Sequence, residues 1–402
     1  MIRFPTRARH VTRLALAAAW MALAATAGWL SIAASPATAA TAPLFGSALF
    51  AFPGATTNPA SAASAGLAMA DRWLGEDPFD NPAAASALGG QLSGAILHVS
   101  RQDLRANNRN FDETPAFFDG SGLVVGLPAH GRFGFNLYAF QPLFQQESNA
   151  FSRGSGTPDP ANPPGTIEAQ STASEMRAGA AVSAALGSAR VGAALEWVRR
   201  DDQYQVREES GSPESGVRQL DLTGDGIGFQ IGATLDRGDS NSRGIRVGLG
   251  LRHHPALPAD ASFSQALLTG STDTTLSVER EAGWEIGTSA RYTASPAVRV
   301  LASLGSRSGR AWQGFDLAAG HAWEWKLALE YHDARDPWTL RLGLGQQHES
   351  DVPEPRADDL GLGFCWRFTH VTTDLGLVHR TLVRTSTPHS FEDRIVLTVR
   401  TP

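Results

Sequence analysis

Apolar and polar residues alternate strictly in the C-terminal part of this chain. In the run 338–345 every second residue is Trp or Leu, and the residues between them are Thr, Arg and Gly. In the run 360–368 Leu, Phe and Trp alternate with Gly, Cys and Arg. A period of two is that of a β-strand, whose successive side chains point to opposite faces. Each run therefore predicts a strand with one apolar face and one polar or glycine face.

The connections of these two strands differ in length. A long polar segment, 346–359, separates the runs, whereas the chain turns within a few residues near Thr369 and His370 after the second run. Transmembrane β-barrels have strands of about ten residues, short periplasmic turns and longer outer loops. The pattern therefore predicts an all-β fold, a transmembrane antiparallel β-barrel.

The same alternation recurs from residue 92 onward and predicts about 14 strands, with 12 as the lower bound. Short connections follow the even-numbered strands, so an even count leaves both termini on the periplasmic side. The segment 253–273 is expected to be a loop with a short helix. The predicted strands are 92–101, 117–127, 132–141, 171–186, 190–200, 220–235, 245–252, 276–292, 298–304, 323–331, 338–345, 360–368, 375–379 and 391–399.

A secreted β-sandwich or adhesin also alternates and is the main alternative. Its core face would need bulky side chains from every strand, whereas here the faces opposite the apolar ones carry glycine, Arg, Glu and Gln. Aromatic residues near predicted strand ends favour the barrel, because they resemble a membrane aromatic girdle. They are Trp197, Trp284, Tyr292, Trp323, Tyr331, Trp338 and Trp366.

The N-terminal region does not alternate and divides the chain into three parts. Four arginines precede an Ala/Leu-rich run and an Ala37-x-Ala39 pattern, which predicts a cleaved signal peptide over 1–39; a single membrane anchor is the alternative. Residues 40–90 are rich in Ala, Ser, Gly and Pro and contain several large apolar residues, so we expect a partly helical hatch, or plug, in the lumen. Residues 91–402 form the barrel.

Short helices are expected on both sides of the DPFDNP segment of the hatch. Asp77 and Asn81 are plausible helix caps, and Pro82 suits a first helical position.

Charge and cysteine content narrow the range of functions. The signal segment holds four of the 34 basic residues and no acidic residue, so the remainder carries 30 − 40 = −10 charges. Nucleic acid as a partner is therefore not expected, since phosphate binding needs concentrated positive charge. The single cysteine, Cys365, excludes an intrachain disulfide and a CxxC site, and its position in the alternation points it inward.

Several stretches together resemble the outer-membrane transport proteins for long-chain fatty acids and other hydrophobic compounds. The pre-barrel GLAMADRWLGEDPFDNPAAAS resembles the family's N-terminal hatch, with Asp71 and Asn81-Pro82-Ala83 at the motif positions and Arg72 replacing a second Asp. GLVVGLPAHGRFGFNLYAFQP is similar to the second strand, tight turn and third strand. The stretch 338–377 resembles a strand–loop–strand region near the C-terminus.

The resemblance implies a fourteen-stranded barrel, a hatch, and diffusion of a hydrophobic ligand through a lateral opening near a kinked third strand. Pro142 follows the predicted third strand and can interrupt the ladder there, since proline lacks the amide hydrogen. The chain departs from the family in ending Thr-Val-Arg-Thr-Pro, without the terminal aromatic residue usual in barrels handled by the assembly machinery. A related group of barrels acts in protein secretion, and the motifs do not separate the two.

The sequence lacks the common motifs of covalent, metal and nucleotide chemistry. Gly-x-Ser-x-Gly, HExxH, P-loop and GxGxxG motifs are absent, so no enzymatic activity, cofactor or metal is expected. His253 and His254 are adjacent and would point to opposite faces, and the segment 221–226 lacks the later Glu of a calcium loop.

The inward-facing arginines are the residues most suggestive of ligand binding. They either form ion pairs across a wet lumen or bind a carboxylate head group, which suits bidentate guanidinium geometry. The inward set consists of Arg246, Arg252, Arg291, Arg299, Arg341 and Arg367, with Glu285, Glu324, Lys326 and Glu330, and the candidates for ligand binding are Arg246, Arg291, Arg299, Arg341 and Arg367.

The first hypothesis is a passive channel in the bacterial outer membrane for hydrophobic small molecules such as long-chain fatty acids. Its expected partners are that molecule or lipid, outer-membrane lipids and the barrel assembly machinery, with a monomeric state. The alternatives are a protein-binding accessory in secretion or envelope assembly, and an enzyme on a barrel scaffold.

Overall fold

The computed structural model describes the barrel and the parts of the hatch that lie against it. The described residues are 70, 73–74, 78–86, 90–102, 112–116, 122–153, 165–209, 216–239, 243–267, 270–308, 312, 321–332, 337–349, 356–383 and 390–401. The expected signal peptide, 1–39, and most of the hatch, including Asp71 and Asp77, lie outside the described residues.

The described residues contain one short 3-10 helix and seventeen strand segments. The helix is η1 (Pro82–Ser86). The strands are β1 (Gly90–Gln102), β2 (Asp112–Ala116), β3 (Gly122–His130), β4 (Phe133–Arg153), β5 (Gly165–Leu186), β6 (Ala189–Glu209), β7 (Gly216–Asp239), β8 (Arg243–His254), β9 (Leu257–Leu267), β10 (Gly270–Arg280), β11 (Gly283–Ser295), β12 (Val298–Arg307), β13 (Ala322–His332), β14 (Trp338–Glu349), β15 (Arg356–Arg367), β16 (Thr372–Val383) and β17 (Ser390–Thr401).

These segments form fourteen barrel strands, because three barrel strands are each built from two segments. β2 and β3 both pair with β1, β8 and β9 both pair with β7, and β10 and β11 pair with β9 and β8 in turn. All pairings are antiparallel, and β1 closes the ring against β17 over nearly its whole length. The predicted count of fourteen and the predicted fold class are confirmed, with 17 − 3 = 14 strands.

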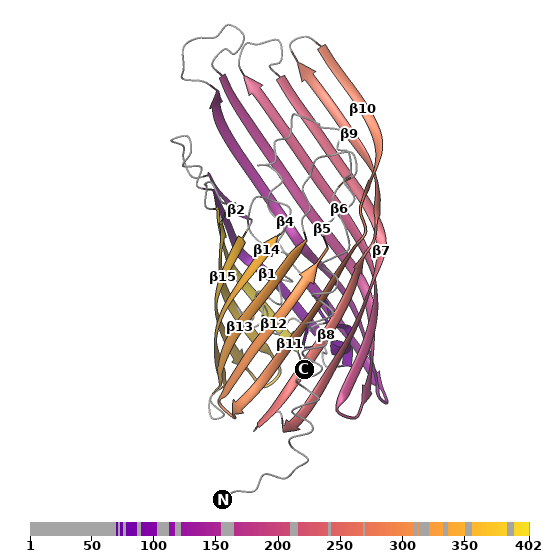
Figure 1. Ribbon diagram of the computed structural model, residues 1–402, viewed down its shortest axis with the longest axis vertical. Helices are drawn as coiled ribbons and strands as arrows, with labels where there is room; N and C mark the ends of the chain where they lie inside the picture. Colours follow the sequence, from indigo (N-terminus) through magenta and orange to yellow (C-terminus); the bar gives the residue numbers. More distant parts are fainter. Residues whose placement is uncertain are drawn as a thin grey trace, which may run out of the picture. The chain divides into compact units, whose positions relative to one another are not determined.

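Short turns gather at one end of the barrel, called here the turn end. The other end, the loop end, carries the longer connections together with the short β9–β10 connection (Figure 1). In the turns after β3 and β5, Gly131 and Gly187 have φ angles of 62° and 67°. This left-handed conformation is open to glycine at little steric cost and allows two-residue hairpin turns. The unequal connections predicted from the sequence are therefore present.

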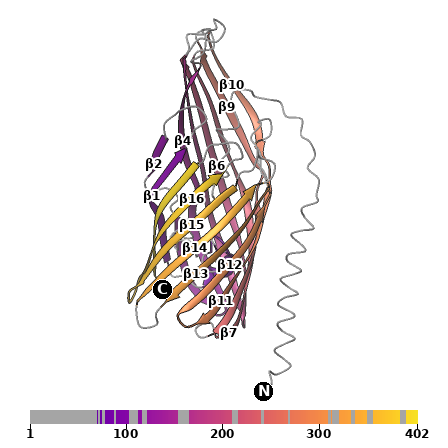
Figure 2. The same ribbon diagram turned by 60° about the vertical axis from the view of Figure 1, so that its left-hand side comes forward.

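Strands β4 to β7, with β9 and β10, project beyond the rest of the barrel at the loop end (Figures 1 and 2). The loop predicted over 253–273 is wrong, since β9 and the start of β10 occupy it. In this wall the apolar side chains face inward, as Leu220 and Leu222 do, while the outward Thr223 and Asp225 are exposed. The polarity is thus reversed relative to the part of the barrel nearer the turn end, called here the lower barrel. A prediction based on apolar outer faces therefore did not identify these strands.

The outer face of the lower barrel is a continuous apolar band. Leu342 and Leu362 face each other in register on β14 and β15 and are 46% and 49% exposed. Aromatic side chains border the band: Trp284 lies near the loop-end border, and Tyr331 packs against Trp338 at the turn end. Exposed apolar surface of this extent, with aromatic borders, is that of a transmembrane barrel. Among the described residues no helix is long and apolar enough to cross a membrane.

Candidate functional site

The described part of the hatch is centred on η1 and is buried against the inner face of the barrel. The Ala83 N–H donates to Asn81 Oδ1 at 3.0 Å, so the Asn81 side chain caps the helix that Pro82 begins. Asn81 Nδ2 donates to the Trp73 carbonyl at 2.6 Å and to the Leu249 carbonyl of β8 at 3.2 Å. Asn81 therefore joins two parts of the hatch to each other and to the wall.

Four glycines on neighbouring strands form the surface on which the hatch rests. Gly192, Gly232, Gly250 and Gly287 lie in register across β6, β7, β8 and β11. A Cβ at Gly192 or Gly232 would overlap Asn81, Pro82 or Ala83, and a Cβ at Gly250 or Gly287 would overlap the Trp73 ring. These four residues, called here the glycine row, let the hatch backbone and the Trp73 indole lie directly against the backbone of the barrel wall.

An apolar cluster, called here the hatch patch, joins the hatch to β3 and β4. Phe79 packs edge-on against Tyr138, with ring centroids 5.3 Å apart, and lies 4.5 Å from the Phe140 ring. The patch consists of Phe79, Ala85, Val124, Tyr138, Phe140, Ala181 and Ala194.

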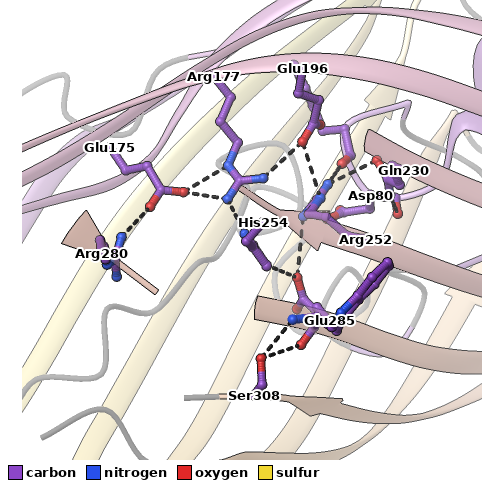
Figure 3. Close-up of polar contacts among 12 residues, drawn as sticks. Asp80, Glu175, Arg177, Glu196, Gln230, Arg252, His254, Arg280, Glu285 and Ser308 are labelled. Carbon is purple, nitrogen blue, oxygen red and sulfur yellow. Dashed lines mark hydrogen bonds and ion pairs between the residues drawn. The ribbon is translucent and has the colours of Figure 1, made fainter. Parts of the chain in front are cut away.

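Above the hatch patch, toward the loop end, lies a set of buried ion pairs (Figure 3). Arg177 on β5 is 1% exposed and bonds Glu175 at 2.5 Å and Glu196 at 2.9 Å. Its Nη2 also lies 2.7 Å from His254 Nδ1. Burying a charged group in this way is tolerated because several partners satisfy it.

Arg252 extends the ion pairs to the hatch. It lies 3.6 Å from Glu196 and 3.5 Å from Glu285, and its Nη2 donates to Gln230 Oε1 at 3.2 Å. The same guanidinium donates to the Phe79 carbonyl, and the Gln230 amide donates to the Asp80 carbonyl. Two hatch carbonyls are thus held by side chains of β7 and β8.

Tyr138 connects the hatch patch to the ion pairs. Its hydroxyl donates to Glu196 Oε1 at 2.8 Å by crossing over β5 at Gly179. A Cβ at Gly179 would lie 2.8 Å from the Tyr138 hydroxyl oxygen, so glycine is needed for this crossing.

The ion pairs continue toward the loop end. Glu175 accepts from Arg280 at 3.3 Å, and Arg200 bonds Asp202 at 2.6 Å. Trp312, from the connection between β12 and β13, donates its indole N–H to Asp202 at 2.9 Å. The name charged layer is used below for Glu175, Arg177, Glu196, Arg200, Asp202, Arg252, Arg280 and Glu285.

A second apolar cluster, the mouth patch, lies beyond the charged layer on the inner face of the projecting wall. Phe263 and Val278 pack against it. The patch consists of Tyr204, Leu220, Leu222, Leu257, Ala259, Ala261 and Trp312.

Strand β6 shows the order of these layers along the lumen. Its inner face runs from the glycine row through the hatch patch and the charged layer to the mouth patch, in the sequence Gly192, Ala194, Glu196, Val198, Arg200, Asp202 and Tyr204. On β7 the inner face runs from Gly232 of the glycine row, past Gln230, which bonds Arg252 of the charged layer, to Leu222 and Leu220 of the mouth patch. The lumen is therefore apolar on both sides of a charged layer.

Of the inward set predicted from the sequence, Arg252 and Glu285 lie in the charged layer. The five candidate arginines lie elsewhere, nearer the turn end. Arg299 bonds Glu330 at 2.6 Å, and Arg341 bonds the same carboxylate at 3.1 Å and also Asp374. Arg246 pairs with Asp236, with an Nη2–Oδ2 distance of 3.0 Å. The structure thus joins Arg299 and Arg341 through one glutamate.

The two remaining predicted arginines lie apart from that pair. Arg291 on β11 faces Arg246 in register, and Arg367 is exposed at the turn end of β15.

Glu175, Arg177 and Glu196 of the charged layer were not predicted from the sequence. All three lie in strands predicted correctly, at positions facing away from the apolar outer side. A charged residue at an inward position in the middle of a strand could have identified them. In the segment 171–186 most residues are small, so the inner and outer faces of the strand were hard to tell apart from the sequence.

Pro142 lies within β4, which continues to Arg153 instead of ending at 141. The β4–β5 register shifts between Phe140 and Leu143. These two residues are three positions apart on β4, whereas their partners Arg177 and Glu175 are two positions apart on β5. This extra residue is a β-bulge. On its other side β4 pairs with β3 as far as Phe140.

No group of three His, Cys, Asp or Glu side chains in the described part of the chain is arranged to hold a metal ion.

Comparison with protein-family models and with curated protein sequences finds no match. Comparison with solved structures finds the same fold in several proteins. A Pseudomonas aeruginosa FadL homologue matches with a TM-score of 0.61 at 14% identity, over 88% of this chain and 99% of the other. The Pseudomonas putida toluene transporter TodX matches with a TM-score of 0.53 at 13% identity, over 81% and 93%. The CymD monoaromatic hydrocarbon channel matches with a TM-score of 0.53 at 14% identity, over 85% and 98%.

Proposed function

We propose that this chain, which shares the barrel fold of those hydrophobic-compound channels, is a passive channel for hydrophobic small molecules in the bacterial outer membrane. The observation that carries the proposal is the layered lumen. Two apolar patches lie inside a barrel whose lumen also holds the hatch. A pore for polar solutes would instead have a polar interior filled with water.

The two patches suggest a route for the ligand. A hydrophobic molecule enters at the mouth patch, passes the charged layer and reaches the hatch patch. Phe140 of the hatch patch immediately precedes the bulge at Pro142, where β4 loses its regular register with β5. We therefore propose the bulge as a lateral exit into the membrane, which spares an apolar molecule from crossing water.

Two classes of ligand fit a channel for hydrophobic small molecules. Long-chain fatty acids are expected from the sequence resemblance, whereas TodX is a toluene transporter and CymD a monoaromatic hydrocarbon channel. The protein itself supplies binding surface and exclusion of water, without covalent chemistry, so an enzymatic role is not proposed.

The test has two parts. The full-length protein is purified in detergent and its retained small molecules are identified by mass spectrometry, and uptake of labelled hydrophobic compounds is measured in cells. Deletion of residues 41–90 should abolish selective retention while the barrel still assembles. Absence of a retained hydrophobic molecule together with uptake that is independent of the barrel would refute a transport role. Stoichiometric co-purification of a protein partner would favour the accessory role instead.

A further inference from the structure

The charged layer lies between the two apolar patches, so its charges decide which head group a ligand can carry through the lumen. Arg177 and Glu196 are at most 1% exposed, and Arg252 is 3% exposed. A ligand group that enters this layer leaves water and must find its counter-charge there.

Each arginine of the layer already faces a carboxylate. Arg177 bonds Glu175 and Glu196, and Arg252 lies within 3.6 Å of Glu196 and Glu285. Arg200 bonds Asp202, and Arg280 bonds Glu175. Four arginines therefore face four carboxylates, so the layer has a net charge of 4 − 4 = 0 with His254 neutral.

The arginines nearer the turn end are paired in the same way. Arg341 contacts two carboxylates, Glu330 and Asp374, and Arg299 contacts Glu330. In the loop-end half of β16, Arg380 likewise bonds Asp359 in a bidentate pair at 2.6 and 3.1 Å. Bidentate pairing of this kind occupies the geometry that a ligand carboxylate would use.

An ionised ligand would have to displace one of these carboxylates. The displaced Glu or Asp would remain buried without its partner, which is strongly unfavourable. An uncharged ligand leaves every pair intact and gains contact with aromatic side chains in both patches, among them Tyr204, Trp312, Phe79 and Tyr138.

We infer that the substrate is an uncharged hydrophobic molecule, an inference that rests on the proposed channel function. The charged layer, whose net charge is zero, discriminates against carboxylates. This assigns the layer a role in specificity. It also replaces the expectation that lumen arginines bind a fatty-acid head group.

The test compares probes that differ only at the head group. Binding of oleyl alcohol and oleate, and of toluene and benzoate, to the full-length protein is measured by equilibrium dialysis at pH 8, where the acids are ionised. We expect the wild type to bind each uncharged probe at least tenfold more tightly than its carboxylate. Equal affinity for oleate and oleyl alcohol would overturn the inference and leave the channel function standing. If no probe binds and uptake fails, the proposed function itself fails.

The variant Glu196→Gln supplies the decisive arm, because it removes one negative charge from the layer and keeps the side-chain size. Its layer carries four arginines and three carboxylates, so oleate affinity should rise at least tenfold while oleyl alcohol affinity is unchanged. Asp201→Asn is the matched control: it removes the same charge from the outer face of the same strand, where Asp201 pairs with Arg199 at 3.0 Å, and should change neither affinity.

Assembly of each variant is checked by its heat-dependent mobility in gels. If Glu196→Gln does not assemble, Glu285→Gln makes the same change at the other side of Arg252. Unchanged oleate affinity in an assembled variant would refute the role of the charged layer.

Discussion

At the scale of single residues, the glycine row shows how a missing side chain positions the hatch. A Cβ at Gly250 would overlap atoms of the Trp73 ring, whereas a Cβ at Gly305, the next glycine along the same row on β12, would meet the flexible side chain of Glu324 at 3.1 Å. The two positions therefore differ in what an added methyl group displaces.

Gly250→Ala should loosen the hatch. Overpacking of this kind costs about 1–3 kcal/mol, which corresponds to an increase of roughly 5–150-fold in the population with an unseated hatch. Ion conductance in planar bilayers measures the change, and Gly305→Ala is the control that should leave conductance low. Equal conductance of wild type and Gly250→Ala would show that Trp73 does not hold the hatch.

A second residue-scale prediction concerns the ion pairs. Arg341→Met leaves Glu330 with one partner fewer and Asp374 buried without its closest one, and should destabilise the folded barrel by about 3 kcal/mol. The midpoint of urea unfolding in detergent reports the loss. Arg356→Met is the comparison, since its pair with Asp358 is half-exposed and should shift the midpoint little. Similar shifts in the two variants would contradict the importance of burial.

The inward position of Cys365 and the capping position of Asn81 were predicted from the sequence, because alternation and capping are local properties. Cys365 is 1% exposed, and Asn81 caps η1. The partners of Arg177 were not predictable in this way. They come from β5, β6 and β8, and the pattern of one strand does not specify which inward side chain of another lies opposite.

At the scale of the strands, the two faces should respond differently to charge. Leu342 lies in the apolar band of β14, about midway across it, and Leu342→Arg should cost about 2–4 kcal/mol of folded-barrel stability, since arginine is costly at the bilayer midplane. Phe368→Arg, at the turn end, should cost about 0–1 kcal/mol because the interface is hydrated. Unfolding in lipid vesicles gives both values, and an equal cost would contradict the placement of the band.

The bulge in β4 yields a prediction about the exit. Deletion of Pro142 removes the one extra residue between Phe140 and Leu143, so that β4 and β5 match step for step from Arg177 to Glu175. Uptake of hydrophobic compounds should fall several-fold while heat-dependent mobility shows an assembled barrel. Undiminished uptake by the assembled deletion variant would exclude the bulge as the exit.

The strands of the lower barrel were predicted well, whereas those of the wall that projects at the loop end were predicted poorly. β14 and β15 alternate with apolar residues outside, and both were predicted, although β14 extends to Glu349 and β15 begins at Arg356. β9 also alternates, but its apolar residues face the lumen and its outward side chains are polar. A period of two identifies a strand, whereas which face is apolar depends on whether lipid or water surrounds that part of the barrel.

At the scale of the whole molecule, fourteen strands followed from counting alternating segments, and a closed barrel followed from the recurring asymmetry of short and long connections. The structure closes the ring through β1 and β17. The contact of the hatch with the lumen wall did not follow from a pattern in the barrel sequence. It depends on glycines that look like ordinary strand packing until their register across four strands is known.

The glycine row also constrains the order in which the molecule assembles. Its members come from four separate strands, and a slip of one residue in any of them would present a large side chain such as Val191, Ile231 or Ile286 in place of the glycine. The surface that Trp73 and Pro82 contact therefore forms only after β6, β7, β8 and β11 are in register. Hatch docking therefore follows correct pairing of these strands, and a seated hatch is found only on a barrel wall whose strands have paired in register.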